Sequence, residues 1–374
     1  MAEQLTDGRV LLLSSTWNGP ETEPSFVMRS LAGATSRRRP VDVVTPGPFR
    51  SPRADGLFDV HQIGTTSPGA IGTVTPGAVG TVTPGAVGTV SEDRTWPLPG
   101  DARWPALHPP ALVLVHADDA GAMALALQFA PTAPLVALAS STRPVPQVDA
   151  LITVTPDRRD SVADANPDVA ARVYDTGLHV PVNPFVTKRP HSGIGFVDYL
   201  LVLTDRAAGS GGHSLHPTAL VAWLAARFPR QHTVIIEDGV ATVWQWRSRR
   251  GAIDVETRTD LWRLFAHARA VIDLRPGPLV ARECVEAQLV GTPIVAPSGS
   301  IGAEHAAAGG GIGFSNVDEL LRAVASLEDE VVRDKLGQQG RTAAEDRYGH
   351  PDRLVDRMAH IVSAIEQAGT RQRR

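Results

Sequence analysis

Several features that would narrow the function of this 374-residue sequence are scarce or missing. Cys284 is its single cysteine, so no disulfide can form within the chain, and the sequence fits a reducing compartment. No apolar run approaches the roughly 20 residues that a membrane-spanning helix requires. The first ten residues also lack the basic-then-apolar pattern of a signal peptide. We therefore expect a cytoplasmic protein, and contact with a membrane surface stays open.

An excess of charge of either sign is also missing. The chain carries 36 basic and 40 acidic residues, a net charge of −4. We therefore expect no nucleic-acid partner. Only Lys188 and Lys335 among the basic residues are lysines. Codon bias in a GC-rich genome is the ordinary explanation, but the scarcity leaves few positions for a phosphate-binding lysine.

What the sequence does contain is an alternation of short apolar runs with amphipathic segments. The short runs predict buried parallel strands, and apolar residues at helical spacing predict the helices between them. The predicted strands are 10–14, 41–45, 112–115, 135–139, 151–154, 199–203, 233–236, 270–274 and 293–296. The predicted helices are 26–34, 120–129, 218–228, 261–268, 279–289, one capped by Asn316 with Glu319 as its capping-box partner, and 354–365.

This order predicts two doubly wound α/β halves. The stretch 175–190, rich in Gly, Pro and Asn, reads as the connection between them. We expect one Rossmann-like domain over 1–182 and a second over 183–350. A last helix with a basic tail, 351–374, would pack back towards the first domain. Two such domains facing each other would leave a ligand cleft between the carboxyl ends of their strands.

Residues 66–90 form a repeat of the type TPGAVGTV, with Pro68, Pro76 and Pro84 eight residues apart. Three copies of so short a period cannot build a core, and each Pro-Gly pair indicates a turn. We interpret the repeat as an inserted surface loop. The alternative is a stack of turns that serves as a docking or self-association surface.

The most informative segment is 286–296, with the sequence EAQLVGTPIVA. A predicted helix carrying Glu286 ends at Gly291, and a buried strand follows Thr292 and Pro293. This resembles the signature Glu-Ala-Met-Ala-x-Gly-Thr-Pro-Val-Val-Ala of the group 1 glycosyltransferases, retaining enzymes of the GT-B fold that use nucleotide sugars. Further segments resemble the family in the same order: 12–31, 114–118, 149–154, 180–185 and 261–274.

The resemblance covers most of the chain outside 50–105 and implies the α/β GT-B fold, two facing Rossmann-like domains with a cleft between them. The first would hold the acceptor and the second the nucleotide-sugar donor. Glu286 would accept two hydrogen bonds from the ribose diol. Thr292 of the same motif would belong to the donor site. The start of the preceding helix would bind the diphosphate at Gly277, Pro278, Leu279 and Val280, with the backbone N–H groups of Gly277, Leu279 and Val280 as donors, since proline has none.

Two catalytic residues are implied by the same resemblance. Arg206 would contact the donor phosphates and offset charge on the departing diphosphate. His116 would lie beside the reacting end of the sugar. Gly19 is the glycine that remains in the expected donor loop. For Arg206 the alternative is an ordinary surface arginine, for His116 a structural histidine, and for Glu286 a solvated helix position.

The sequence also departs from the family pattern. Pro278 stands where the family has the first glutamate of a pair, eight residues before Glu286, and Gly211 stands where it has a lysine. Asp118 and Asp119 without further ligands do not make a metal site.

The leading hypothesis is a glycosyltransferase that moves a sugar from a nucleotide-diphosphate sugar to an acceptor hydroxyl, with retention and with neither metal nor cofactor. The acceptor could be a glycan, a lipid, a protein or a small molecule. The alternative is an inactive glycosyltransferase-like scaffold or interaction protein, motivated by the missing glutamate and lysine. A sugar-nucleotide epimerase of the same fold matches the pattern less well.

Overall fold

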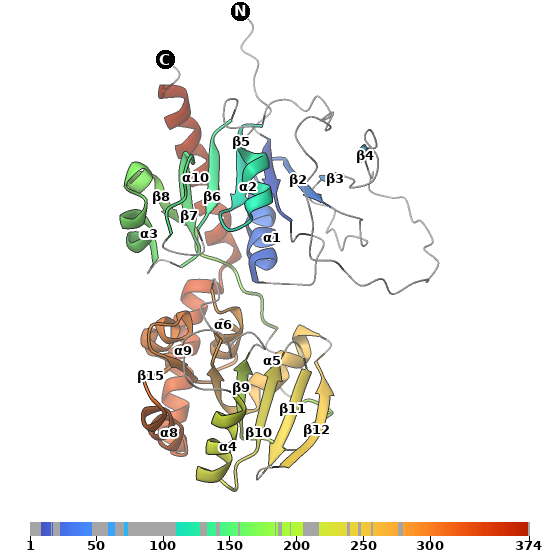
Figure 1. Ribbon diagram of the computed structural model, residues 1–374, viewed down its shortest axis with the longest axis vertical. Helices are drawn as coiled ribbons and strands as arrows, with labels where there is room; N and C mark the ends of the chain where they lie inside the picture. Colours follow the sequence, from blue (N-terminus) through green and yellow to red (C-terminus); the bar gives the residue numbers. More distant parts are fainter. Residues whose placement is uncertain are drawn as a thin grey trace, which may run out of the picture. The chain divides into compact units, whose positions relative to one another are not determined.

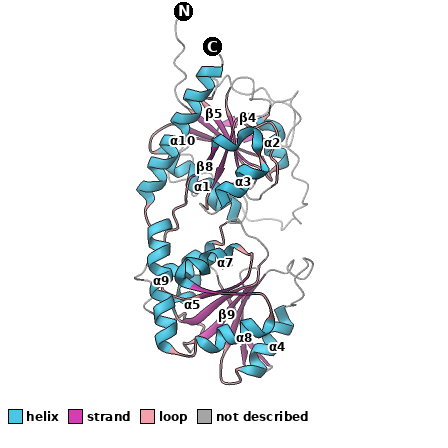
Figure 2. Ribbon diagram, turned by 90° about the vertical axis from the view of Figure 1, so that its left-hand side faces the viewer, coloured by secondary structure: helices cyan, strands magenta, loops and turns pink. Residues whose placement is uncertain are grey.

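The chain forms two compact units, one of residues 1–178 with 351–374 and one of residues 179–350 (Figure 1). Each is an α/β unit in which helices lie on both faces of a sheet (Figure 2). The computed structural model describes residues 9–15, 17, 23–46, 59–63, 71–73, 110–127, 133–139, 143–155, 158–183, 185, 189–194, 196–204, 217–237, 240–245, 248–255, 257–275 and 280–372.

The N-terminal unit is built on a sheet with the strand order β4-β3-β2-β1-β5-β6-β7-β8. All neighbouring strands are parallel except β3 and β4. The strands are β1 (Val10–Leu13), β2 (Val41–Pro46), β3 (Asp59–Ile63), β4 (Ile71–Thr73), β5 (Leu112–His116), β6 (Leu135–Leu138), β7 (Ala150–Thr153) and β8 (Val173–Asp175). The helices are α1 (Glu23–Ser36), α2 (Ala120–Ala126), α3 (Arg159–Ala165), a 3₁₀ helix (Pro167–Arg172) and α10 (Pro351–Gln372).

The central strands of this sheet are buried along their whole length. Every residue of β1, VLLL, and of β5, LVLVH, is buried. Continuous apolar runs of this kind are required of parallel strands that carry helices on both faces, since both sides of the strand lose contact with water. The short apolar runs in the sequence therefore predicted these strands correctly.

Helix α10 completes the N-terminal unit from the far end of the chain. Its predicted apolar stripe is buried: Leu354, Val355, Met358, Ile361, Val362 and Ile365. Arg39, which follows α1, donates to Glu366 of α10 at 2.5 and 2.8 Å. Arg37 and Arg38 form longer pairs, both 3.4 Å, with Asp352 and Asp356 of the same helix.

The C-terminal unit has the strand order β12-β11-β10-β9-β13-β14-β15. Its strands are β9 (Tyr199–Thr204), β10 (Thr233–Glu237), β11 (Val240–Gln245), β12 (Ser248–Asp254), β13 (Ala268–Asp273), β14 (Ile294–Pro297) and β15 (Gly311–Phe314). Its helices are α4 (Pro217–Arg227), α5 (Arg258–Ala266), α6 (Arg282–Leu289), α7 (Ile301–His305), a π-helical turn (Ala306–Gly310), α8 (Val317–Ser326) and α9 (Glu330–Tyr348). Strands β10, β9, β13, β14 and β15 form the parallel part, and β11 and β12 add an antiparallel hairpin at one edge.

Two predicted details differ in the structure. Helix α6 begins at Arg282 rather than at Leu279, because Ala281 before it has a left-handed backbone with φ 47° and ψ 56°. The side chain of Asn316 caps α8 through the amide of Glu319 at 2.9 Å. The carboxylate of Glu319, however, accepts from the amide of Ser315 at 2.7 Å instead of closing a capping box on Asn316.

The repeat at 66–90 is described at residues 71–73, which form the edge strand β4 and pair antiparallel with β3. This part is a strand and not the predicted loop, and the other residues of the repeat lie outside the described residues. Among the helices that the structure describes, none combines the length and the apolar character needed to cross a lipid bilayer.

Candidate functional site

Each sheet has a point at which the strand order reverses. In the C-terminal unit this point lies between β9 and β13, and in the N-terminal unit between β1 and β5. Ligands of open parallel sheets bind beyond the carboxyl ends of the two strands at such a point, because the following loops diverge there. The residues that follow these four strands are therefore the ones on which a site can be built.

At the C-terminal unit's reversal point, β9 ends at Thr204 and β13 ends at Asp273. The hydroxyl of Thr204 is buried and has no hydrogen-bond partner among the described residues. The chain that leaves β13 leads into α6, whose residues are almost all buried. Glu286 lies on this helix and is 0 % exposed.

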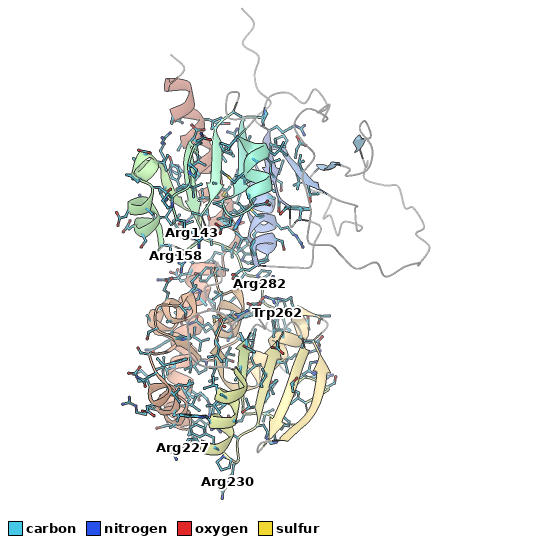
Figure 3. The ribbon with its side chains drawn as sticks, in the orientation of Figure 1. Arg143, Arg158, Arg227, Arg230, Trp262 and Arg282 are labelled. Atoms are coloured by element: carbon cyan, nitrogen blue, oxygen red, sulfur yellow. The ribbon has the colours of Figure 1, made fainter. Side chains whose placement is uncertain are left out.

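Two arginines hold the carboxylate of Glu286. Its Oε1 accepts from Nε of Arg258 at 3.2 Å and from Nε of Arg282 at 2.9 Å. Its Oε2 lies 3.0 Å from Nη2 of Arg258, out of line for a hydrogen bond. Figure 3 labels Arg282 on α6 and Trp262 on α5, which both interact with this carboxylate. In this structure Glu286 is not the solvated helix residue of the alternative interpretation.

The ion pairs continue from Glu286 to the end of β13. Glu283 accepts from Nη1 of Arg258 at 2.8 Å and from Nη1 of Arg275 at 2.7 Å. Arg275 binds Asp273 with two parallel hydrogen bonds of 2.8 and 2.9 Å. The thiol of Cys284 donates to the same Asp273 at 3.0 Å. Three guanidinium groups thus alternate with three carboxylates in one network, which we call the arginine–carboxylate network.

The two glutamates of this network respond to it in opposite directions. Burial opposes the ionisation of Glu283, but Arg275 and Arg258 outweigh it and hold its pKa well below the usual range. For Glu286 burial prevails and raises the pKa, although Arg258 and Arg282 oppose the shift. Opposed shifts in adjacent carboxyl groups occur at functional sites and also in structural ion-pair networks. The pKa shifts alone therefore do not distinguish a functional site from a structural ion-pair network, and the geometry must decide.

Cys284 is not a candidate nucleophile. Burial and the neighbouring Asp273 carboxylate raise the pKa of its thiol well above the usual value. A thiolate is the reactive form, so this side chain stays an inert hydrogen-bond donor. Its place is in the packing of α6 against β13.

Of the other predicted donor residues, Val280 and Thr292 are described. Val280 is buried, and its carbonyl oxygen lies 2.7 Å from Nε2 of the buried His305. Thr292 lies at the opposite end of α6 from Arg282, where its hydroxyl donates to the carbonyl of Phe265 at 2.7 Å. Its amide donates to the carbonyl of Ala287, the residue after Glu286, at 2.9 Å, and its place in a donor site stays a prediction. The remaining residues lie outside the described part: Gly19, Arg206, Gly211, Gly277, Pro278 and Leu279.

His116 lies at the reversal point of the N-terminal sheet as the last residue of β5. It is 8 % exposed, and within the described part of the chain its Nε2 atom has no hydrogen-bond partner. Burial lowers the pKa of His116, against the opposing effect of the Asp118 and Asp119 carboxylates. The ring is therefore neutral near pH 7, with one ring nitrogen a donor and the other an acceptor.

Asp119 next to it has a structural task. Its Oδ2 accepts from the amide of Ser15, which follows β1, at 2.7 Å, and its Oδ1 caps α2 through the amide of Ala122 at 3.0 Å. Across the described residues no group of three or more His, Cys, Asp or Glu side chains is placed to hold a metal ion. The expectation that the reaction needs no metal ion stays a prediction.

A pH dependence of stability follows from the buried neutral His116. Its pKa in the folded state lies below the unfolded value of about 6.5. As the pH falls through that range, the unfolded state therefore binds more protons than the native state does. We therefore expect the free energy of unfolding to fall between pH 7 and pH 5, and to fall less in His116→Gln. Urea unfolding at several pH values measures this, with His360→Gln, an exposed histidine of α10, as the matched control. Equal slopes for wild type and His116→Gln would contradict it.

The sequence did not reveal the three arginines that hold the carboxylates. A signal for them was present in α6, where the run RECVEAQL places an arginine and two glutamates between residues typical of a core. Charged side chains on a helix that is buried on all sides must find partners inside the protein. Such a pattern predicts a buried ion network, but not its partners Arg258 and Arg275, which come from other segments.

Comparison with protein-family models and with curated proteins gives no match for this chain. Solved structures do match. Sucrose-phosphate synthase from Thermosynechococcus elongatus has a TM-score of 0.65 at 11% identity, over 96% of this chain and 99% of that one. WaaG, a glycosyltransferase involved in lipopolysaccharide biosynthesis, has a TM-score of 0.58 at 12% identity, with coverages of 93% and 98%. HepE of Anabaena, solved with UDP and glucose, has a TM-score of 0.61 at 14% identity, with coverages of 95% and 99%.

These likenesses define the class of fold. Each extends over nearly the whole of both chains, so both units and their order in the sequence are shared. The protein has the GT-B fold, with two Rossmann-like α/β domains, as the sequence predicted. At identities of 11–14% the likeness shows the fold and leaves the activity to be argued from the site.

Proposed function

We propose that this protein transfers a sugar from a nucleotide-diphosphate sugar to an acceptor hydroxyl, with retention and without a metal ion. The observation that carries the proposal is the place of Glu286. This carboxylate is fully buried on α6, in the network that reaches Asp273 at the carboxyl end of β13. The fold is shared with WaaG, a glycosyltransferase, and with HepE, which was solved with UDP and glucose. The segment that carries Glu286 also has the glycosyltransferase-like sequence EAQLVGTPIVA.

In this proposal the C-terminal unit holds the nucleotide. Glu286 accepts hydrogen bonds from the vicinal hydroxyls of the ribose, since both oxygens of a carboxylate act as acceptors. Arg206 and the backbone N–H groups of Gly277, Leu279 and Val280 bind the diphosphate and stabilise the negative charge that grows on it as it departs. With Pro278 at the position of a family glutamate, these donors act without help from a second carboxylate there.

His116 has its proposed role in the N-terminal unit. A neutral imidazole offers one hydrogen-bond donor and one acceptor, and the Nε2 atom of His116 is directed at no other described group. We assign it to a sugar hydroxyl, which it would orient during transfer. The acceptor class stays open between glycan, lipid, protein and small molecule.

Calorimetry with UDP-, GDP- and ADP-glucose tests the donor assignment. UDP-glucose is the first choice because a second structure of HepE, TM-score 0.60, contains it. Wild type should bind at least one of the three with micromolar affinity. Glu286→Gln keeps the size of the side chain but weakens its acceptor strength, so we expect affinity to fall about 10- to 100-fold.

Glu345→Gln, an exposed glutamate of α9, is the matched control and should bind like wild type. If wild type binds none of the three donors, the proposal is wrong and the scaffold interpretation is favoured.

Further experiments test the rest of the proposal. With an acceptor found by screening the four classes, the anomeric configuration of the product reports retention or inversion. Addition of EDTA tests metal dependence, and conversion of the donor itself to another sugar nucleotide would indicate an epimerase.

A further inference from the structure

We propose that Arg258 is a latch on Glu286: it occupies the carboxylate that a ribose would use, and it must release that carboxylate before a nucleotide binds. This inference rests on the proposed function and adds the regulation of the same site. It starts from the contacts of one side chain, whose guanidinium spans two carboxylates, those of Glu286 and Glu283.

The number of acceptor positions on Glu286 carries the first step. A carboxylate has about four lone-pair positions. Arg258 donates to Oε1 at 3.2 Å, and Arg282 donates to the same oxygen at 2.9 Å. Nη2 of Arg258 also lies 3.0 Å from Oε2, as an ion pair out of line for a hydrogen bond. The positions on Oε1 are therefore taken and Oε2 is covered by a guanidinium, whereas a ribose diol needs access to both oxygens. Departure of Arg258 frees a position on Oε1 and uncovers Oε2, and departure of Arg282 would free a position on Oε1 alone.

The two arginines also differ in how easily they can leave. Arg282 is 7 % exposed and lies four residues before Glu286 on the same helix, so α6 itself holds the pair together. Arg258 is 28 % exposed and is the first residue of α5, a separate element. Its departure from Glu286 breaks a contact between two elements and none within α6. Arg258 is therefore the partner that a ligand can displace.

Glu283 offers Arg258 a contact that it can keep after it has released Glu286. Nη1 of Arg258 contacts Glu283 at 2.8 Å, independently of the contacts to Glu286. Glu286 is fully buried and the Glu283 side chain is only 18 % exposed, so an unpaired charge on either is costly. Movement of Arg258 away from Glu286 therefore costs less free energy if its contact with Glu283 is kept than if both contacts are lost. The released Arg258 then stays next to the bound nucleotide as a cation.

A closed latch lowers affinity in proportion to the fraction of open molecules. If about 1 to 10% of molecules are open, the apparent affinity for a nucleotide is about 10- to 100-fold weaker than that of the open site. Weakening the contact of Arg258 with Glu286 should therefore strengthen binding. Loss of a residue that only supports the fold would weaken binding or leave it unchanged.

Calorimetry with UDP on four proteins tests this: wild type, Arg258→Lys, Arg258→Met and the control Arg263→Met. Lysine keeps one charge for Glu283 but cannot span both carboxylates, and methionine keeps only the length of the stem. We expect UDP to bind both Arg258 variants at least 10-fold more tightly than wild type. Arg263, on the same helix with Asp260 as a partner at 3.4 Å, should have no such effect.

A second measurement does not depend on the methionine variant folding. In the NMR spectrum of the wild-type protein, the Nε–H signal of Arg258 should shift on addition of UDP, while that of Arg282 stays close to its free position. Binding of UDP to wild type with equal or weaker binding to a folded Arg258→Lys would overturn the latch and leave the proposed function standing. Failure of all four proteins to bind UDP or any other nucleotide would overturn both.

Discussion

Gly337→Ala should lower the free energy of unfolding by about 3 kcal/mol or more, although alanine usually stabilises a helix. Gly337 lies inside α9, and a Cβ atom built on it would come within 2.2 Å of the carbonyl oxygen of Gly291. The obstacle is backbone, in the turn that follows α6, so it cannot rotate away as a side chain would. The helix would have to move off α6, which carries Glu286. Chemical denaturation of the full chain measures the loss.

Gly33→Ala is the matched control, a helical glycine of α1 whose added Cβ would meet nothing within 4 Å. There the ordinary preference applies, and we expect a gain of about 0.5–1 kcal/mol. Opposite signs for the two variants would show that close backbone approach, and not helix propensity, decides the outcome at Gly337. A neutral or stabilising Gly337→Ala would contradict the packing of α9 on α6.

This packing also explains why α9 was not predicted from the sequence. Its buried positions are Gly337, Gly340, Ala344 and Tyr348, so small residues take the place of an apolar stripe. A search for apolar residues at helical spacing finds no pattern in such a helix. The hairpin of β11 and β12 was missed for a different reason. It lies at the edge of the sheet as an addition to the alternating order of strands and helices on which the prediction relied.

The strands that were predicted share one property, which is burial on both faces. Runs such as 199–203 and 270–274 have no other stable place than the inside of a parallel sheet. The same alternation, with the motif at 286–296, was sufficient for the GT-B fold. The fold could therefore be predicted because its core strands are locally unambiguous.

The candidate site was predictable only in part. Glu286 and His116 were proposed as site residues through a family resemblance, and each lies in the region of its sheet where the strand order reverses, while their roles stay predictions. Their surroundings could not be predicted, because ion pairs between residues 25 or more positions apart depend on how α5, α6 and the end of β13 meet. Arg258 is the clearest example, since no local pattern distinguishes it from the other arginines.

The second large effect concerns Glu283, which links Arg258 to Arg275. Glu283→Ala leaves the arginine–carboxylate network with one positive charge in excess, largely buried, and we expect a loss of about 3 kcal/mol in the free energy of unfolding at pH 7. The loss should depend on pH. The pKa of Glu283 is lowered in the folded state, so its stabilising effect is fully present above the unfolded value of about 4.3 and decreases as the pH falls below it.

Urea unfolding of wild type and Glu283→Ala at pH 7 and at about pH 3.5 measures this, and the gap between the two proteins should narrow at the lower pH. Glu345→Ala supplies the control, because Glu345 forms an exposed pair with Arg341 on α9, and such pairs contribute less than about 1 kcal/mol. Equal losses for the two variants would mean that the network stabilises the fold no more than a surface ion pair does. A large loss of free energy of unfolding in Glu283→Ala, with a small loss in Glu345→Ala, would show that the arginine–carboxylate network is a stable part of the fold. Arg258 could then move between its two carboxylates while the rest of the network stays in place.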